Sequence, residues 1–93
     1  MLNDNPLLAF LGKRGRGAVV EALRRNPGRP LHIRELARLA DVAPMVASRA
    51  ARELAALRAV HVSREGRLLA LRLDLKSPAG EFLASVSPPD PPF

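Results

Sequence analysis

Residues 33–57, IRELARLADVAPMVASRAARELAAL, carry two stretches of helical periodicity separated by a few residues that favour a turn. Residues 33–40 have the apolar spacing of an amphipathic helix. Its expected inner face consists of three residues, Leu36, Ala37 and Ala40. Asp41 tolerates the left-handed backbone conformation that a tight turn needs, and Pro44 suits the first turn of a following helix. The segment therefore predicts a short helix, a tight turn and a longer helix that ends near Leu57.

The longer helix is expected to turn small and apolar side chains inward. Its predicted inner face is Ala47, Ala50, Ala51, Leu54 and Leu57. Its predicted outer face is Met45, Ser48, Arg49, Arg52 and Glu53. Arg49 and Arg52 share a face at a spacing of three residues, although Arg49 can instead pair with Glu53 four residues later. At the helix ends, Ala43 offers no side-chain cap, and Arg58 stands where Gly commonly adopts a left-handed conformation.

A basic hairpin follows these two helices. Residues 60–64 and 67–75 alternate in character and flank Glu65-Gly66, a two-residue loop of the hairpin type. In the second strand, one predicted face is formed by Leu69, Leu71, Leu73 and Leu75. The order of two helices and a hairpin predicts a mainly α fold with a small β-hairpin wing, which is an α+β winged helix-turn-helix.

The flanking segments complete a single domain. Further helices are expected over residues 6–11, which follow the capping sequence Asp4-Asn5-Pro6, over residues 16–25, and from Ser77-Pro78 onward. Residues 31–33 suit an edge strand, and His32 precedes Glu35 by the three residues of a capping box. We expect the domain to cover residues 1–86. The Pro-rich tail, residues 87–93, is expected to be extended and mobile.

The charge is concentrated in the middle of the chain. The formal net charge is +6, and residues 13–76 hold all fifteen Lys and Arg with six of the nine acids, which gives that segment a net charge of +9. Such a field favours a polyanionic partner. A compositional bias toward Arg, Ala and Pro would produce the same excess, so the charge alone leaves both explanations open.

Signals for catalysis, metals and membranes are missing from the sequence. The chain contains no Cys and two His residues, His32 and His61, neither of which lies in an acidic cluster. The basic segment 12–17, GKRGRG, lacks the spacing of a phosphate-binding loop. No apolar run approaches a membrane span, and the first ten residues lack the features of a secretory signal. We therefore expect a cytoplasmic protein that is not an enzyme and uses no cofactor or metal.

Four segments carry a family resemblance: residues 14–27, HIRELARL at 32–39, VAPMVASRAAREL at 42–54, and residues 60–73. Their order resembles the winged helix-turn-helix of the ArsR-like and MarR-like prokaryotic transcriptional regulators. It is more similar still to the wing-helix domains that precede prokaryotic nucleotidyltransferase modules. The resemblance implies the winged-helix fold and, through it, a role in binding nucleic acid.

The expected DNA contacts follow from how a helix-turn-helix docks. The second helix enters the major groove and its N-terminal half meets base edges, while the hairpin tip lies on the backbone or in the minor groove, and arginines of the first helix contact phosphate. The candidate DNA-binding residues are Arg34, Arg38, Pro44, Met45, Ser48, Arg49, Arg52, Arg64 and Arg67.

Two functions compete at this point. The first is a sequence-specific regulator of transcription that binds double-stranded DNA as a homodimer, with the apolar segments 6–11 and 78–86 as the dimer surface. The alternative is a winged-helix protein-interaction module that partners a nucleotidyltransferase or belongs to a larger assembly. The apolar tip of the second helix, Met45 and Val46, favours the alternative.

Overall fold

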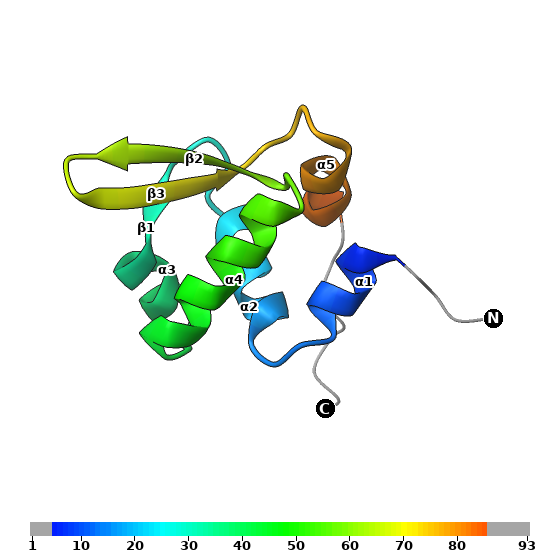
Figure 1. The fold of residues 1–93 in the computed structure, drawn as a ribbon, viewed down its shortest axis with the longest axis horizontal. Coiled ribbons are helices and arrows are strands. Elements are labelled where there is room, and N and C mark those ends of the chain that lie inside the picture. The colour runs from blue at the N-terminus through cyan, green and yellow to red at the C-terminus, as the bar shows by residue number, and fades with distance from the viewer. Residues whose placement is uncertain (1–4, 86–93) are drawn as a thin grey trace.

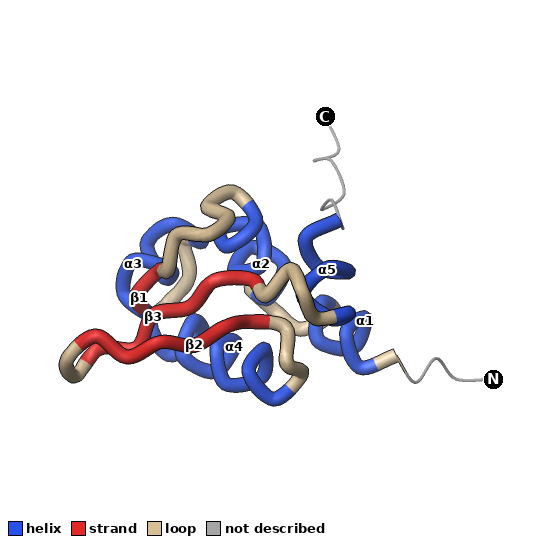
Figure 2. The backbone as a smooth tube through the Cα atoms, turned by 90° about the horizontal axis from the view of Figure 1, so that it is seen from above, coloured by secondary structure: helices blue, strands red, loops and turns tan. Residues whose placement is uncertain are grey.

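The computed structural model describes residues 5–85, which form five helices and a three-stranded sheet. In chain order the elements are α1 (Pro6–Leu11), α2 (Arg16–Arg24), β1 (Leu31–His32), α3 (Ile33–Ala40), α4 (Pro44–Ala56), β2 (Val60–Glu65), β3 (Leu68–Leu73) and α5 (Pro78–Ser85). The sheet forms a layer above α3 and α4, α5 lies beside the end of the sheet that is away from the hairpin tip, and the β2–β3 hairpin extends beyond the helices (Figures 1 and 2).

The core lies between the helices and the sheet. Its fully buried leucines come from six different elements, namely Leu23, Leu31, Leu36, Leu54, Leu71 and Leu83. The predicted inner faces of α3 and α4 are buried as expected, except that Leu57 is half-buried against the core. Burial of these apolar side chains is the main force that holds the two helices in place.

The turn between α3 and α4 has the predicted backbone conformation. Asp41 lies in the left-handed region at φ 56° and ψ 49°, and Pro44 occupies the first turn of α4. The ends of α4 also agree with the sequence. Ala43 is its N-cap without a side-chain hydrogen bond, and Arg58 follows the helix at φ 59°. Each end of α4 thus lacks a common stabilising feature: the N-terminal end has no capping side chain, and the C-terminal end has a non-glycine residue in the left-handed region.

The hairpin register differs from the prediction by one residue. Glu65 pairs with Leu68, so the two-residue loop is Gly66-Arg67 rather than Glu65-Gly66. Gly66 has a φ of 65°, in the left-handed region that favours glycine. This places Gly at the first central position, as in a type II′ turn, and it moves Arg67 from the second strand to the tip.

The second strand is also shorter than predicted, because β3 ends at Leu73 rather than at residue 75. The amide of Asp74 donates to the carbonyl of Ala59, and the Asp74 carboxylate then accepts from the backbone amide of Lys76 at 3.0 Å. This local turn competes with strand extension, and it leaves Leu75 exposed. The sheet order is β1-β3-β2 with both pairings antiparallel, so β1 is the expected edge strand.

The predicted helix starts are confirmed at α1 and α5. At α3 the start is confirmed, but the predicted capping hydrogen bond is absent. The side chain of Asn5 accepts from the amide of Leu7, and Ser77 accepts from the amide of Gly80, both at 2.9 Å. His32 is the N-cap of α3, yet its side chain makes no capping bond, so the capping box is wrong. Its Nε2 lies 2.9 Å from a carboxylate oxygen of Glu65 instead.

The apolar segments at the two ends pack largely within the protomer. Phe10 of α1 and Leu83 of α5 are buried, and Leu7, Leu11 and Phe82 are partly buried against the same core. Leu8 is the large apolar side chain of α1 that stays exposed. The predicted dimer surface is therefore smaller than the sequence indicated. Residue 86 and the predicted tail, residues 87–93, lie outside the described residues.

Candidate nucleic-acid interface

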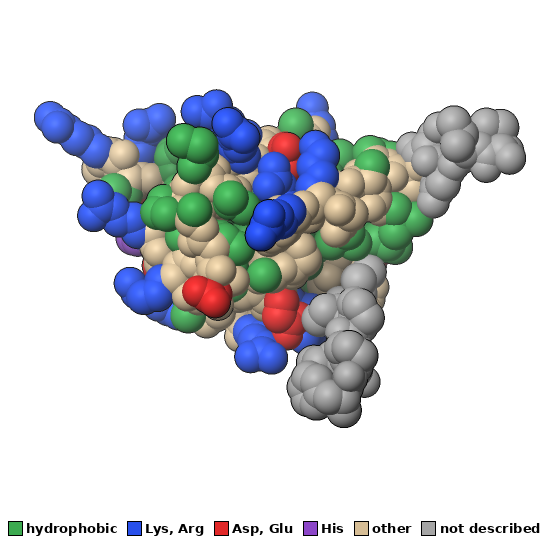
Figure 3. Space-filling model, turned by 90° about the horizontal axis from the view of Figure 1, so that it is seen from below, with side chains coloured by type: hydrophobic (Ala, Val, Ile, Leu, Met, Phe, Trp, Pro, Cys, Tyr) green, Lys and Arg blue, Asp and Glu red, His purple; other side chains and the backbone are tan. Residues whose placement is uncertain are grey.

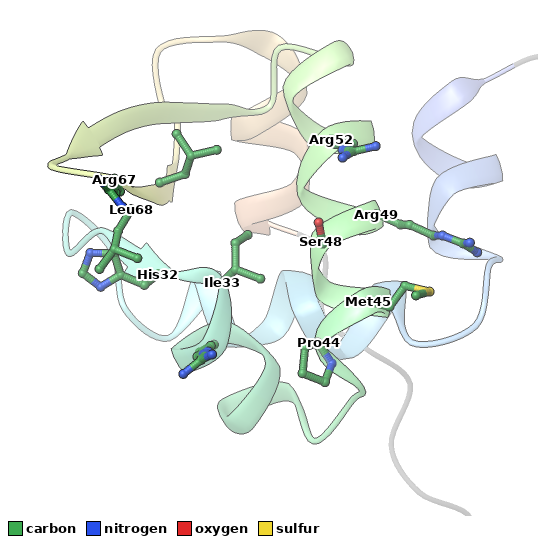
Figure 4. A pocket seen from close by; sticks show the side chains of 11 residues that line it. His32, Ile33, Pro44, Met45, Ser48, Arg49, Arg52, Arg67 and Leu68 are labelled. Carbon is green, nitrogen blue, oxygen red and sulfur yellow. The ribbon is translucent and has the colours of Figure 1, made fainter.

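A groove of 890 Å³ runs between the start of α3, the outward face of α4 and the tip of the hairpin. Its lining residues are His32, Ile33, Arg34, Pro44, Met45, Ser48, Arg49, Arg52, Arg67, Leu68 and Leu69. In Figure 4, Ser48 lies centrally, Arg49 and Arg52 project on the side of α4 away from the hairpin, and His32 and Leu68 lie opposite them. The groove thus has an apolar and hydroxyl interior with cationic borders.

The outward face of α4 exists because its inward face is made of small residues. Ala47, Ala50 and Ala51 are buried against the core, so the residues between them point to solvent at helical spacing. Arg49 and Arg52 are exposed, and Ser48 is half-buried. Met45, in the first turn of α4, is 65% exposed.

Most of the residues predicted from sequence line this one groove. The structure brings together Arg34, Pro44, Met45, Ser48, Arg49, Arg52 and Arg67. Two predicted residues lie outside it: Arg38, which is exposed in the last turn of α3, and Arg64, which is exposed on β2 opposite Leu69.

Sequence reasoning missed four lining residues: His32, Ile33, Leu68 and Leu69. The shift in hairpin register explains part of this, because Leu68 becomes the first residue of β3, directly after the tip. The available signal was the position of Leu68 directly after Gly66-Arg67, because a leucine beside a hairpin turn has no core to face. In the structure Leu68 is 57% exposed.

The arginines that border the groove are not neutralised by any residue between 5 and 85. No acidic residue lines the groove. Within residues 5–85, Arg34, Arg49, Arg52 and Arg67 form no ion pair. Glu35 of α3 is instead bound by Arg29. In Figure 3, Lys and Arg side chains dominate the upper border of the face shown. An anion that enters the groove therefore meets guanidinium groups without competing partners.

The hairpin is linked to the helices at the end of the groove. The 2.9 Å contact between His32 Nε2 and Glu65 Oε1 joins the residue before α3 to the last residue of β2. Residues 32 and 70 are paired across β1 and β3, which supports the same junction through the backbone. The hairpin tip is thus held beside the groove rather than attached through its own strands alone.

A second charged cluster, whose residues do not line the groove, joins α4 to the start of α2. Arg16 donates to both oxygens of Glu53 at 2.9 and 3.2 Å, and Lys13 donates to one of them at 3.1 Å. Hydrogen bonds from Arg16 and then from Lys13 outweigh partial burial and lower the pKa of Glu53 to about 2, while the same bond raises the pKa of Arg16.

Sequence reasoning could not find this cluster. Arg16 and Glu53 are 37 residues apart, and no periodic pattern relates residues at such a distance. The spacing rule offered only Arg49 as a partner for Glu53, and the structure shows that the carboxylate is occupied elsewhere. The buried guanidinium of Arg16 marks the cluster as part of the fold.

Two broader features concern the described part of the chain. None of the helices between residues 5 and 85 has the length and apolar character needed to cross a bilayer. Over the same residues, His, Asp and Glu side chains do not gather in groups of three or more that could hold a metal ion.

The arrangement of helices, sheet and hairpin defines a winged helix-turn-helix protein, and comparison with solved structures shows the same fold. The crystal structure of the AntR antimony-specific transcriptional repressor superposes with a TM-score of 0.67 at 24% sequence identity, over 83% of this chain and 67% of that one. The fold expected from the sequence is therefore confirmed. No protein-family profile matches the chain, and no curated protein sequence matches it.

Proposed function

We propose that this protein is a sequence-specific regulator of transcription that binds double-stranded DNA, with α4 in the major groove and the β2–β3 hairpin on the backbone or in the minor groove. The observation that carries the proposal is the groove itself. It is bordered by four arginines that no carboxylate in the described residues neutralises.

The geometry of α4 suits the major groove of B-DNA. That groove is about 12 Å wide and admits one α-helix. Arg49 and Arg52 lie three residues apart on the exposed face, where each can bond guanine in a bidentate way or clamp a phosphate. Ser48 lies between them and the hairpin, and Met45 near the helix start offers an apolar contact to a thymine methyl group.

The hairpin and α3 supply contacts that hold position rather than sequence. Arg67 at the tip borders the groove, and Arg34 does so from the first turn of α3. Phosphate contacts of this kind set register on the duplex and dominate affinity. Arg38 and Arg64 are exposed beyond the groove, and we assign them to more distant phosphates.

The comparison structure supports regulation but not its effector. The neighbour is a transcriptional repressor that is specific for antimony. Soft metals and metalloids are held by thiolates, and the 93 residues of this chain contain no Cys. We therefore propose regulation of transcription for this chain, but we do not propose antimony as its effector.

The first experiment tests whether α4 reads DNA. Duplexes bound by the full chain are selected from a random pool, and their affinity is measured by fluorescence anisotropy. Changing Arg49 and Arg52 together to Ala should abolish selection of a preferred sequence and weaken binding by about 1–3 kcal/mol for each lost base contact. The matched control changes Arg25 and Arg72 to Ala, which also removes two positive charges but at positions outside the groove, and it should preserve the selected sequence.

The second arm tests the hairpin. Changing Arg64 and Arg67 to Ala should weaken binding to all duplexes alike and reduce the salt slope. A wild-type protein that leaves heparin at low salt and does not bind any duplex would contradict the proposal. That outcome would favour the protein-interaction module, in which the exposed Met45 contacts a nucleotidyltransferase or another subunit.

A further inference from the structure

Glu53 is the only acidic residue of α4, the helix that presents Arg49 and Arg52. It lies four residues after Arg49, a spacing at which opposite charges on a helix pair with each other. In the structure its carboxylate is bound from outside the helix, since Oε1 accepts from Arg16 and Oε2 accepts from both Arg16 and Lys13. Arg49 consequently has no ion-pair partner among residues 5–85.

The backbone before Arg16 is built for this approach. Gly15 is the N-cap of α2 at φ 78°, a conformation that favours glycine. A Cβ on Gly15 would lie 3.0 Å from Val46 Cγ1 and 3.2 Å from Val42 Cγ1. Only a residue without a side chain therefore lets the start of α2 contact the start of α4 so closely.

The Arg16 side chain is also fixed once it is there. It is 10% exposed, whereas the Lys13 side chain is 54% exposed. Its remaining terminal nitrogen donates to the carbonyl of Arg14 at 3.2 Å. Arg16 is thus the firm partner of Glu53 and Lys13 the weaker one, because exposed ion pairs contribute little.

We propose that Arg16 is a positioning residue for DNA binding: it holds the Glu53 carboxylate away from Arg49 and so keeps Arg49 available to the nucleic acid. This inference rests on the proposed function for the identity of the anion. Without Arg16, only the exposed Lys13 still holds the Glu53 carboxylate, so this carboxylate can turn to Arg49 on its own helix and neutralise it. The border of the groove then loses one of its charges.

The chain contains a matched pair for comparison. On α2, Arg24 donates to both oxygens of Glu21 at 2.9 and 2.7 Å. This pair has the same bidentate geometry, but neither residue lines the groove. Removing Arg24 therefore changes the charge of the protein by the same amount without releasing a carboxylate beside Arg49.

The DNA experiment compares Arg16→Gln, Glu53→Gln, the double variant and Arg24→Gln by anisotropy on a labelled random-sequence duplex. Arg16→Gln should bind about tenfold more weakly at 50 mM salt and lose about one phosphate from the salt slope. The double variant should regain wild-type affinity, although it still lacks the charge of Arg16. Glu53→Gln should bind at least as tightly as wild type, and Arg24→Gln should be unchanged. Equal losses in Arg16→Gln and the double variant would overturn the inference.

A measurement without DNA separates this inference from the proposed function. The titration of the Glu53 carboxyl carbon is followed by NMR with and without Arg49→Gln. In the wild-type background Arg49→Gln should leave the Glu53 pKa unchanged, and in the Arg16→Gln background it should raise it. A rise in the wild-type background would show that Glu53 already pairs with Arg49 and would end the inference, even if Arg16→Gln does not fold. Capture of Glu53 by Arg49 in a protein that binds no duplex would contradict the proposed function alone.

Discussion

Gly80, in the first turns of α5, shows how one missing side chain determines the packing of a helix. A Cβ at this position would collide with the carbonyl oxygen of Asp74 and lie 2.8 Å from that of Ala59. Both obstacles are backbone atoms of the segments that flank the hairpin, and Asp74 and Ala59 are themselves hydrogen-bonded to each other. Neither can move without disturbing the sheet.

We expect Gly80→Ala to destabilise the protein by at least about 2 kcal/mol, because the new methyl group forces α5 away from the sheet. Urea unfolding followed by circular dichroism measures the change. Gly17→Ala is the control, since nothing lies within 4 Å of a Cβ there and the residue is helical. It should stabilise by about 0.5 kcal/mol, and a loss of stability there would refute the steric explanation.

The ion pairs of Glu53 make a prediction about pH. Its pKa is lowered from 4.5 to about 2 by Arg16 and Lys13, so the ionised form contributes stability that is complete above pH 4.5 and is lost as the pH falls through 2. Glu53→Gln should therefore cost roughly 1 kcal/mol at pH 7, less than the shift alone implies because solvent screens the pair. In urea unfolding, the difference in the free energy of unfolding between wild type and Glu53→Gln should shrink as the pH falls from 4.5 to 2. A difference that does not change with pH would show that it does not come from the charge of Glu53.

At the scale of elements, the sequence predicted what depends on periodicity and missed what depends on contacts. The faces of α3 and α4 follow from apolar spacing, and Asp41 and Pro44 mark the turn between them. The sequence predicts the hairpin loop one residue too early, because Glu65-Gly66 and Gly66-Arg67 both suit a two-residue turn. Only the pairing of Glu65 with Leu68 distinguishes them.

The candidate site was predictable to the same extent. Arginines on one helix face are visible in the sequence, whereas the partners of His32 and Arg16 come from distant segments. Spacing within the helix likewise offers Arg49 as the partner of Glu53, whereas the partner in the structure is Arg16 of α2. Local rules name the residues that can meet a ligand, and tertiary packing decides which of their charges stay free.

The C-terminal end of α4 offers a stabilising change. Arg58 is exposed and adopts φ 59°, which costs a non-glycine residue about 1 kcal/mol or more. Arg58→Gly should recover about 1 kcal/mol in thermal unfolding. Ala55→Gly, on the exposed side of the same helix, should lose a similar amount because it replaces a strong helix former. If Arg58→Gly also lowers the stability, the left-handed conformation of Arg58 does not strain the protein.

At the scale of the whole molecule, the groove occupies one region, and the first and last described helices, α1 and α5, lie in another. Figure 1 shows α1 and α5 close together on the side opposite to the hairpin tip. A second copy bound through these helices would leave both grooves open. Two recognition helices of such a dimer would contact half-sites about 34–36 Å apart.

We propose Leu8 as the residue that tests this dimer, because it is 45% exposed on α1. Leu8→Asp should shift the protein from dimer to monomer in sedimentation velocity while its circular dichroism is unchanged. Leu39→Asp is the matched control, since Leu39 is 49% exposed on α3. If only Leu39→Asp dissociates the dimer, the contact lies on α3 and not on α1. If the wild-type protein is itself monomeric, there is no dimer to disrupt and the proposal is wrong.

The exposed tip of the hairpin has a consequence for how such proteins diversify. Leu68 and Glu65 pair at the end of the ladder, outside the core, so residues can be inserted there without repacking the interior. Each added pair lengthens the arm by about 3.3 Å but reverses which side its end residue faces. Natural variants that keep an arginine facing the same way should therefore differ by even steps, and the span of contacted nucleotides should grow in increments of about 7 Å.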